Sequence, residues 1–154
     1  MSEPLKLKVE TPEDLTLLAS LVQDAAIVGS DMHYDPKAHQ FILMANRYCW
    51  EKKRPWWQRG LFAIKHPGER QRCALHFNTV MDVKYKSQTA LDKDAVFSLL
   101  DVKISEEDSE KLELIFAGHM SIALKIECVE IFLTDQGETF EALARPDHTK
   151  DYSE

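Results

Sequence analysis

The residues best suited to binding chemistry fall within one ten-residue stretch, WEKKRPWWQR, which holds all three tryptophans of the chain. Trp50, Trp56 and Trp57 are interleaved there with basic residues, of which Arg54 and Arg59 carry guanidinium groups. Aromatic rings and guanidinium groups together can hold phosphates, form the centre of a protein–protein contact, or dock at a lipid headgroup layer. The same rings can instead lie over a hydrophobic core, covered by lysine and arginine stems. We take these five residues as the candidate partner-binding site.

Charge is distributed unevenly along the chain. The formal net charge is −7, yet residues 52–72 contain seven lysines and arginines and a single glutamate. Residues 101–154 contain 14 acidic residues and five basic ones. The overall acidity argues against nucleic acid as a partner, while the basic segment still suits an anionic ligand. Opposite charge in two parts of one chain favours a protein partner or self-association.

Residue patterns that mark enzymes and metal sites are missing from the sequence. Six histidines occur without HExxH spacing, and there is no GxSxG, GxxxxGK[ST] or GxGxxG motif. We therefore expect no catalytic, cofactor-binding or metal-binding residues, and we interpret the chain as a binding or adaptor module rather than an enzyme. The alternative is a small enzyme or a small-molecule-binding barrel with a pocket near Tyr48, Cys73 and His76.

Cysteine usage and composition indicate a cytoplasmic protein. Cys49, Cys73 and Cys128 form no CxxC pair, which is typical of reduced thiols, and Cys73 and Cys128 are expected to pack in the core. No stretch approaches the roughly 20 apolar residues of a membrane span, and the N-terminus lacks the apolar core of a signal peptide. From a length of 154 residues we expect one globular domain over residues 1–145 and a frayed tail over 146–154.

The strongest structural signal lies in the C-terminal third. Apolar residues alternate with other residues on both sides of Gly118-His119, and glycine supplies the positive φ of a tight turn, so this region is predicted to be a β-hairpin. The period then changes, because Val129, Phe132 and Leu133 have the i, i+3, i+4 spacing of a helix. We therefore predict a C-terminal helix that closes the sheet, with Phe132 buried against it.

The remaining elements are predicted from capping residues and alternation. Thr11-Pro12 begins a helix that runs to about Asp24, after a short opening strand. Residues 95–104 fit a strand or a helix, and we choose the strand because the alternation continues through them. Residues 52–70 are expected to form a long connection. Further strands are predicted over residues 26–34, 41–50, 73–77 and 80–83.

About seven strands and two helices define the expected fold. It is an α+β fold with a mainly antiparallel, strongly bent sheet or small barrel, an N-terminal helix and a C-terminal closing helix. This strand order resembles a pleckstrin-homology-like barrel. The chain also resembles an uncharacterised bacterial family of about this length, a domain of unknown function, in the segments NRYCWE (46–51), RCALHF (72–77) and LIFAGHMSIALKIECVE (114–130). The resemblance implies no activity and supplies no catalytic residues.

Overall fold

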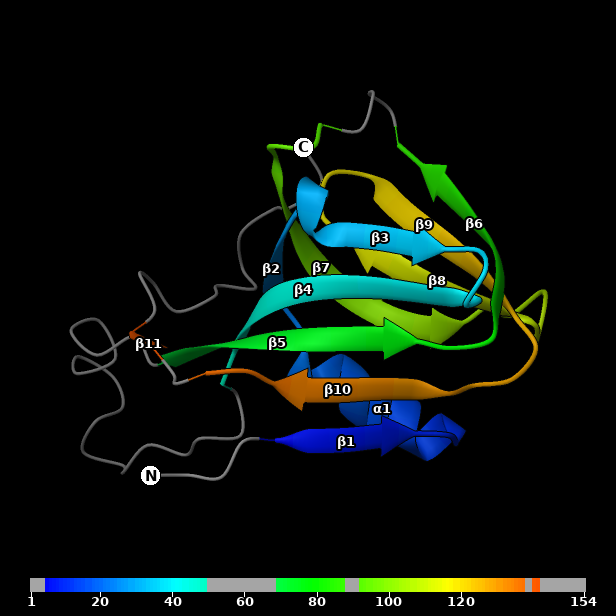
Figure 1. Ribbon diagram of the computed structural model, residues 1–154, viewed down its shortest axis with the longest axis horizontal. Helices are drawn as coiled ribbons and strands as arrows, with labels where there is room; N and C mark the ends of the chain where they lie inside the picture. Colours follow the sequence, from blue (N-terminus) through cyan, green and yellow to red (C-terminus); the bar gives the residue numbers. More distant parts are fainter. Residues whose placement is uncertain (1–4, 50–68, 88–91, 138–139, 142–154) are drawn as a thin grey trace.

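The computed structural model describes residues 5–49, 69–87, 92–137 and 140–141, and the structural statements below concern these residues. They form an antiparallel sheet of eleven strands, one α-helix and one 3₁₀ turn (Figure 1). In chain order the elements are β1 (Lys6–Val9), α1 (Pro12–Leu21), β2 (Ala25–Val28), η1 (Gly29–Asp31), β3 (Met32–Asp35), β4 (Gln40–Tyr48), β5 (Glu69–Phe77), β6 (Val80–Lys86), β7 (Val96–Ile104), β8 (Lys111–Phe116), β9 (Met120–Ile126), β10 (Ile131–Asp135) and β11 (Phe140–Glu141).

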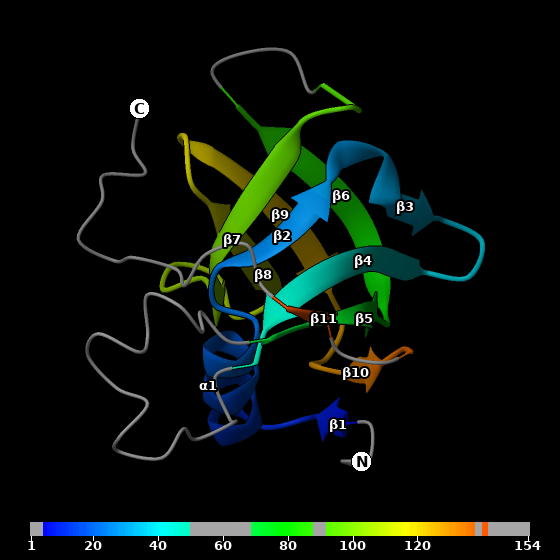
Figure 2. The same ribbon diagram turned by 90° about the vertical axis from the view of Figure 1, so that its left-hand side faces the viewer.

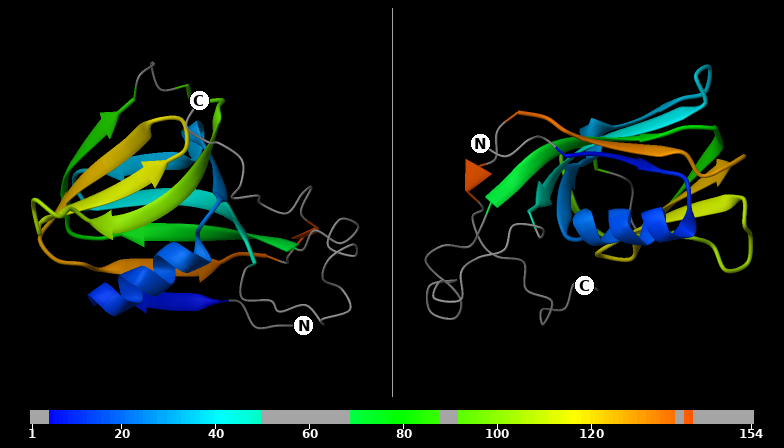
Figure 3. Two further views of the ribbon diagram at one scale, coloured as in Figure 1. Left: turned by 180° about the vertical axis from the view of Figure 1, so that it is seen from behind. Right: turned by 90° about the horizontal axis from the view of Figure 1, so that it is seen from below.

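The sheet bends strongly, so that its two halves enclose a common interior. The strand order is β1-β10-β5-β4-β2-β7-β8-β9-β6, with β3 also paired to β4 and β11 to β5, and every pair is antiparallel. Strands β1, β10, β5 and β4 form one half, and β7, β8, β9 and β6 cross over them in the other (Figure 1 and Figure 3). Within the described residues the terminal strands β1 and β6 are not paired with each other, so the sheet is open.

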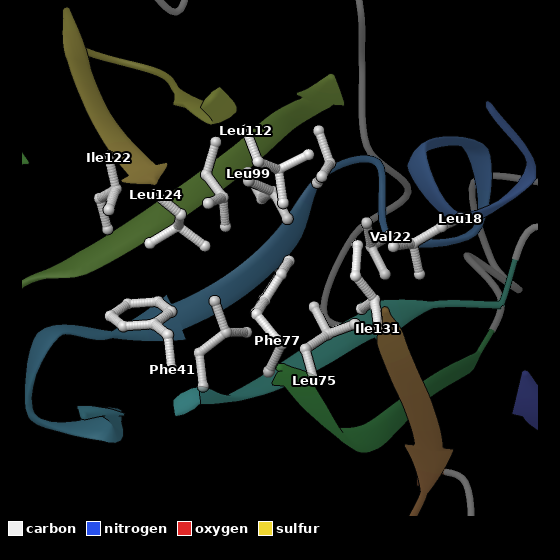
Figure 4. Packing of buried hydrophobic residues seen from close by; sticks show 14 of the residues in the cluster. Leu18, Val22, Phe41, Leu75, Phe77, Leu99, Leu112, Ile122, Leu124 and Ile131 are labelled. Atoms are coloured by element: carbon white, nitrogen blue, oxygen red, sulfur yellow. The ribbon is translucent and has the colours of Figure 1, made fainter. Parts of the chain in front are cut away.

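Side chains from both halves of the bent sheet meet in one core. Along β4 and β5, alternate residues such as Phe41 and Leu75 are fully buried, while the residues between them face the other side of the sheet. Figure 4 shows these core residues facing side chains of the crossing strands. Other members of the core are Leu18, Val22, Phe77, Leu99, Leu112, Ile122, Leu124 and Ile131.

Helix α1 covers one opening of the bent sheet. Its start is fixed locally, because Thr11 Oγ1 accepts a hydrogen bond from the Asp14 amide (3.1 Å) and Asp14 Oδ2 accepts one from the Thr11 amide (3.3 Å). Pro12 occupies the first helical turn, where its missing N–H costs no hydrogen bond. Leu15 and Leu18 are buried, and the helix packs against β1 and β7 (Figure 2). The N-terminal helix predicted from the sequence is thus present.

The C-terminal helix predicted from the sequence is wrong, and of the two expected forms of the sheet, strongly bent or a small barrel, the barrel is wrong. Residues 131–135 form β10, which pairs with β1 on one side and with β5 on the other. Ile131 and Leu133 are buried and Phe132 between them is half-buried, which is the alternation of a strand. A short apolar run fits either period, and here the two neighbouring strands supply its backbone partners. Because the sheet is open and the α-helix is N-terminal, the likeness to a pleckstrin-homology-like barrel is not supported.

Two other expectations about strands are confirmed. The β8–β9 hairpin forms where predicted, although Phe116 pairs with Met120, so that three residues rather than two connect the strands. Gly118 and His119 both have left-handed backbone, with φ of 79° and 60°. The ambiguous residues 95–104 contain strand β7 and no helix. Eleven strands replace the expected seven or so, partly because β10 replaces a helix and β11 had no sequence signal.

Two expectations fall on residues outside the described ranges. The division into a domain over residues 1–145 and a tail over 146–154 stays a prediction, since residues 142–154 are not described. The long connection predicted over residues 52–70 likewise lies mostly between the described ranges, with β5 beginning at Glu69.

The strand at residues 131–135 predicts a specific pattern of mutational effects. Leu133→Ala should lower the free energy of unfolding by about 2–5 kcal/mol, because it removes a fully buried side chain from the core. Phe132→Ala should cost only about 1 kcal/mol, because its half-buried ring lies on the other face under Lys8 Nζ, 5.6 Å from the ring centroid. Urea denaturation measures both, and a larger loss for Phe132 than for Leu133 would contradict the strand.

Candidate functional site

The five candidate contact residues, Trp50, Arg54, Trp56, Trp57 and Arg59, fall between the described ranges, in residues 50–68. The structure does describe the two strands that precede and follow them. Strand β4 ends beside the start of β5, and the contact continues one residue past β4, because the Cys49 amide donates a hydrogen bond to the carbonyl of Glu69, the first residue of β5 (2.9 Å). The candidate residues therefore belong to the connection between two paired antiparallel strands, and the site can be built from the base of that connection.

At this base, Tyr48 and Arg70 pair across β4 and β5 on the face opposite the core. The Arg70 guanidinium lies 5.9 Å from the centroid of the Tyr48 ring, within the range of a cation–π contact. Arg70 Nη1 also donates to the carbonyl oxygens of Asn46 (2.9 Å) and Asp24 (3.3 Å). One half-buried guanidinium thus links β5 to β4 and to the turn between α1 and β2, and its position is fixed by two backbone acceptors and an aromatic ring.

The positive charge of Arg70 lies near the buried carboxylate of Asp24. Burial lowers the pKa of the Arg70 guanidinium, and the negative charge of Asp24 acts in the opposite direction. Asp24 is itself buried, at the point where α1 passes into β2, with a left-handed φ of 62°. Its amide donates to the Leu99 carbonyl at 2.7 Å, which anchors this unusual backbone to β7. No pattern in the sequence indicates that Asp24 is buried beside an arginine.

Arg72 lies two residues along β5, on the same face as Arg70, and is held much more loosely. Its guanidinium reaches Asn46 Oδ1 and Asp31 Oδ2, each at 3.5 Å, the outer limit of a hydrogen bond. The side chains of Arg72 and Asp31 are 43% and 33% exposed, so water competes for this contact. We call Arg70 and Arg72 the arginine pair. Its two positively charged side chains lie near the start of β5, where the connection that carries the candidate residues ends.

The opposite face of the same strands holds a buried ion pair. Arg47 of β4 donates from Nε to Asp135 Oδ1 (2.9 Å) and from Nη2 to Asp135 Oδ2 (2.7 Å). The side chains are 1% and 5% exposed, so this is a desolvated, bidentate contact. Asp135 Oδ2 also accepts from the Leu5 amide (3.1 Å), and Gln71 Nε2 donates to the Gln136 carbonyl (2.8 Å). These contacts on the core face therefore hold the ends of β4, β5 and β10 together below the connection.

The alternative pocket near Tyr48, Cys73 and His76 is not assembled. By alternation along their strands, Tyr48 and His76 lie on the face away from the core, although Tyr48 is buried there, whereas Cys73 lies on the core face. Tyr48 pairs with Arg70, six positions from His76, a separation of roughly 20 Å along a strand. Burial raises the pKa of the Cys73 thiol to about 12, which keeps it protonated and unreactive at neutral pH. These three side chains do not converge.

The described residues contain neither a metal cluster nor a membrane-spanning helix. In those ranges no group of three or more His, Cys, Asp and Glu side chains is placed to hold a metal ion. No helix in the same part of the chain has the length and apolar character needed to cross a membrane.

Comparison with known proteins gives one match. The model of a family described as a protein of unknown function, DUF2948, matches residues 5–148. The chain belongs to this family. The match confirms the uncharacterised domain family inferred from the sequence segments, and its description assigns no activity. No curated protein and no solved structure matches the chain.

The arginine pair could have been recognised in the sequence of β5. Arg70, Arg72 and Ala74 alternate there with Cys73 and Leu75, so the arginines share the outer face of a strand. Sequence reasoning counted both arginines in the basic segment without assigning them to the site. The contact with Asp24 had no comparable signal.

The buried ion pair predicts an uneven response to charge removal. Asp135→Asn should lower the free energy of unfolding by about 3–5 kcal/mol, because it leaves Arg47 buried without its counter-charge. Replacing both residues, Arg47→Met with Asp135→Leu, should cost less than Asp135→Asn alone, since no charge then remains buried. The matched control is Glu10→Gln, which breaks the exposed Lys8–Glu10 pair (3.2 Å) and should cost under about 1 kcal/mol. Equal losses for Asp135→Asn and Glu10→Gln would refute the buried pair.

Thiol reactivity offers a second check on burial. Cys128 is exposed, which corrects the expectation that it packs in the core, whereas Cys49 and Cys73 are buried. In the folded protein at pH 8, a thiol reagent such as DTNB should react rapidly with one cysteine and with all three only after unfolding. Cys128→Ser should abolish the rapid phase. A rapid phase that survives in this variant would mean that a buried thiol is accessible.

Proposed function

We propose that this DUF2948 protein is a non-enzymatic binding module whose partner-binding surface combines the β4–β5 connection with the arginine pair at its foot. The observation that carries the proposal is the position of Arg70 and Arg72 on the outer face of β5, directly after the connection. Trp50, Arg54, Trp56, Trp57 and Arg59 would supply the remaining contacts.

The two arginines would contribute to binding in different ways, because Arg70 is held in place and Arg72 is held loosely. Arg70 is fixed by backbone carbonyls and the Tyr48 ring, so little conformational entropy is lost when a ligand contacts it. Among the described residues, the Arg72 guanidinium has long contacts to Asn46 and Asp31 alone, so it can exchange them for a better acceptor. Carboxylate-rich protein surfaces offer such acceptors, and tryptophan and arginine are the residue types enriched at protein hot spots. We therefore propose an acidic protein surface as the partner.

The chemistry of the described residues favours binding over catalysis. Cys73, the nucleophile candidate of the alternative, is buried, and its pKa is raised to about 12. Tyr48 and Arg70 contact each other at the base of the connection, where the guanidinium lies over the ring. The three cysteines are thiols, which supports a cytoplasmic location as part of the proposal.

Capture from lysate of the source organism tests the proposal. Three baits are compared with the native chain: Arg54→Glu with Arg59→Glu, Arg72→Glu alone, and the control Lys103→Glu with Lys125→Glu. The control makes the same charge change at exposed positions of β7 and β9, in the other half of the sheet. A protein retained by the native and control baits should be lost from the other two, and its retention should weaken as salt rises from about 0.05 M to 0.5 M.

Each outcome has a clear meaning. If all baits retain the same proteins equally, the basic surface is not a binding surface. If only the Arg54→Glu, Arg59→Glu bait loses the partner, Arg72 is not part of that surface. Circular dichroism of each bait first establishes that the fold is intact, because lost capture by an unfolded variant has no bearing on binding.

A further inference from the structure

Among the described residues, strand β6 ends the sheet and has most of one edge unpaired. It is paired to β9 alone, and its first residue is covered by the β3–β4 hairpin. There the Val80 amide donates to the His39 carbonyl (2.8 Å), and the Tyr34 hydroxyl donates to the Val80 carbonyl (3.0 Å). From Met81 to Lys86 no other described residue is hydrogen-bonded to this edge, which lies at the margin of the sheet in Figure 1. Such an edge can template another strand.

The side chains of this edge are unusually apolar for an exposed strand. Met81 is 40% exposed and Tyr85 is 46% exposed, and they are two of the four large hydrophobic residues exposed in the described ranges. Between them lie Asp82 and Lys84, both exposed and of opposite sign. The segment Asp82–Lys84 therefore reads acidic, valine, basic, and opposite charges would face one another if a second copy of the segment ran in reverse beside it.

Backbone direction favours pairing at Val83. The Ile126 amide donates to the Glu110 carbonyl at 2.8 Å, on the β8 side of β9. Because backbone groups of an antiparallel strand alternate between its two sides, the N–H and C=O of Leu124 also point to β8. Val83 lies opposite Leu124, so its own N–H and C=O are not used by β9 and point to the open edge of β6. A second strand aligned there would find both groups available.

We propose that β6 pairs antiparallel with β6 of a second copy, in a symmetric dimer whose two-fold axis passes beside Val83. In this register Asp82 faces Lys84 of the second copy, and Lys84 faces its Asp82. Met81 takes no part in this pairing, because a β-bulge between Val80 and Asp82 shifts the register there and breaks the alternation of faces. The open sheets of the two subunits become one continuous sheet.

The charges on β6 favour this register over the registers centred on neighbouring residues. Paired residues in a continuous sheet share a face, so a symmetric antiparallel pair is centred on one residue. Centring on Asp82 or Lys84 would bring two like charges together at the axis, and centring on Tyr85 would place Lys84 against Lys86 twice. Only the Val83 register pairs unlike charges throughout. The charges that discourage random edge pairing therefore select one partner, a second copy in one alignment.

The contact is small, so the dimer should be weak. Three residues from each chain pair, Asp82 to Lys84, fewer than the roughly 20–30 residues a side of a stable interface. The self-association is accordingly expected at high protein concentration. It does not depend on the proposed function, because β6 contains none of the residues assigned to the β4–β5 surface.

Charge reversal provides the decisive test, measured by sedimentation equilibrium of the full chain over about 10 µM to 1 mM, where weak interfaces associate. Asp82→Lys alone and Lys84→Asp alone each place like charges opposite one another twice, and each should weaken the dimer about tenfold or more. An equimolar mixture of the two variants should restore association as a heterodimer, and the double variant should restore it as a homodimer. The control Lys103→Asp changes a remote exposed lysine of β7 and should leave association unchanged.

Three results would overturn the proposal. The first is a native chain that stays monomeric up to about 1 mM, the upper limit used for weak association. The second is a dimer that neither single reversal weakens. The third is a mixture of the two single variants that associates no better than either alone, since pairing centred on Val83 sets the two lysines of the Asp82→Lys chain against the two aspartates of the Lys84→Asp chain. Both positions are exposed, and melting curves establish that the variants remain folded.

Discussion

The buried contact between Arg47 and Asp135 is the constraint on which the rest of this half of the sheet depends. A guanidinium and a carboxylate with 1% and 5% exposure are stable only if each remains the other's partner, because an unpaired charge in the core costs several kcal/mol, on the order of 3–5. The pair fixes β4 relative to the end of β10, and the bond from the Leu5 amide to Asp135 extends the constraint to the start of β1. The carboxylate of Asp135 thus connects β10 to β4 and to the residue before β1, which are far apart in the sequence.

The same strands serve two purposes because their residues alternate. On β5, Gln71, Cys73 and Leu75 face the interior, where they pack or brace the turn after β10. Arg70 and Arg72 lie between them and face outward, one held by carbonyls and a tyrosine ring, the other loosely paired. A rigid inner face therefore supports a charged outer face, with no rearrangement needed to present it. The proposed binding surface follows from this division of one strand into two faces.

An open sheet has edge strands, and along the outer edge of strand β6 one end is hydrogen-bonded to another part of the described chain while the rest is not. The β3–β4 hairpin covers the start of β6 through His39 and Tyr34, while the rest of β6 exposes two apolar side chains and a pair of opposite charges. Closing the barrel would have removed this edge entirely. The bent but open sheet instead combines a filled core with a strand whose pattern is complementary to its own reverse. Structure and charge pattern together, rather than either alone, give the self-pairing proposal its register.

Local signals in the sequence determined those parts of the fold whose contacts are close along the chain. Thr11, Pro12 and Asp14 define the helix start within four residues, and Gly118 defines a hairpin whose strands adjoin it. Family membership and the absence of an assigned activity were also readable from sequence segments. Residues 131–135 could not be decided locally, because their apolar run fits both periods, and only pairing with β1 and β5 made them a strand. The Arg47–Asp135 pair, separated by 88 positions, and the contact of Asp24 with Arg70 exist only after the sheet has folded. Alternation shows which residues share a face, but tertiary structure decides which faces meet, because distant strands become neighbours only through packing of the common core.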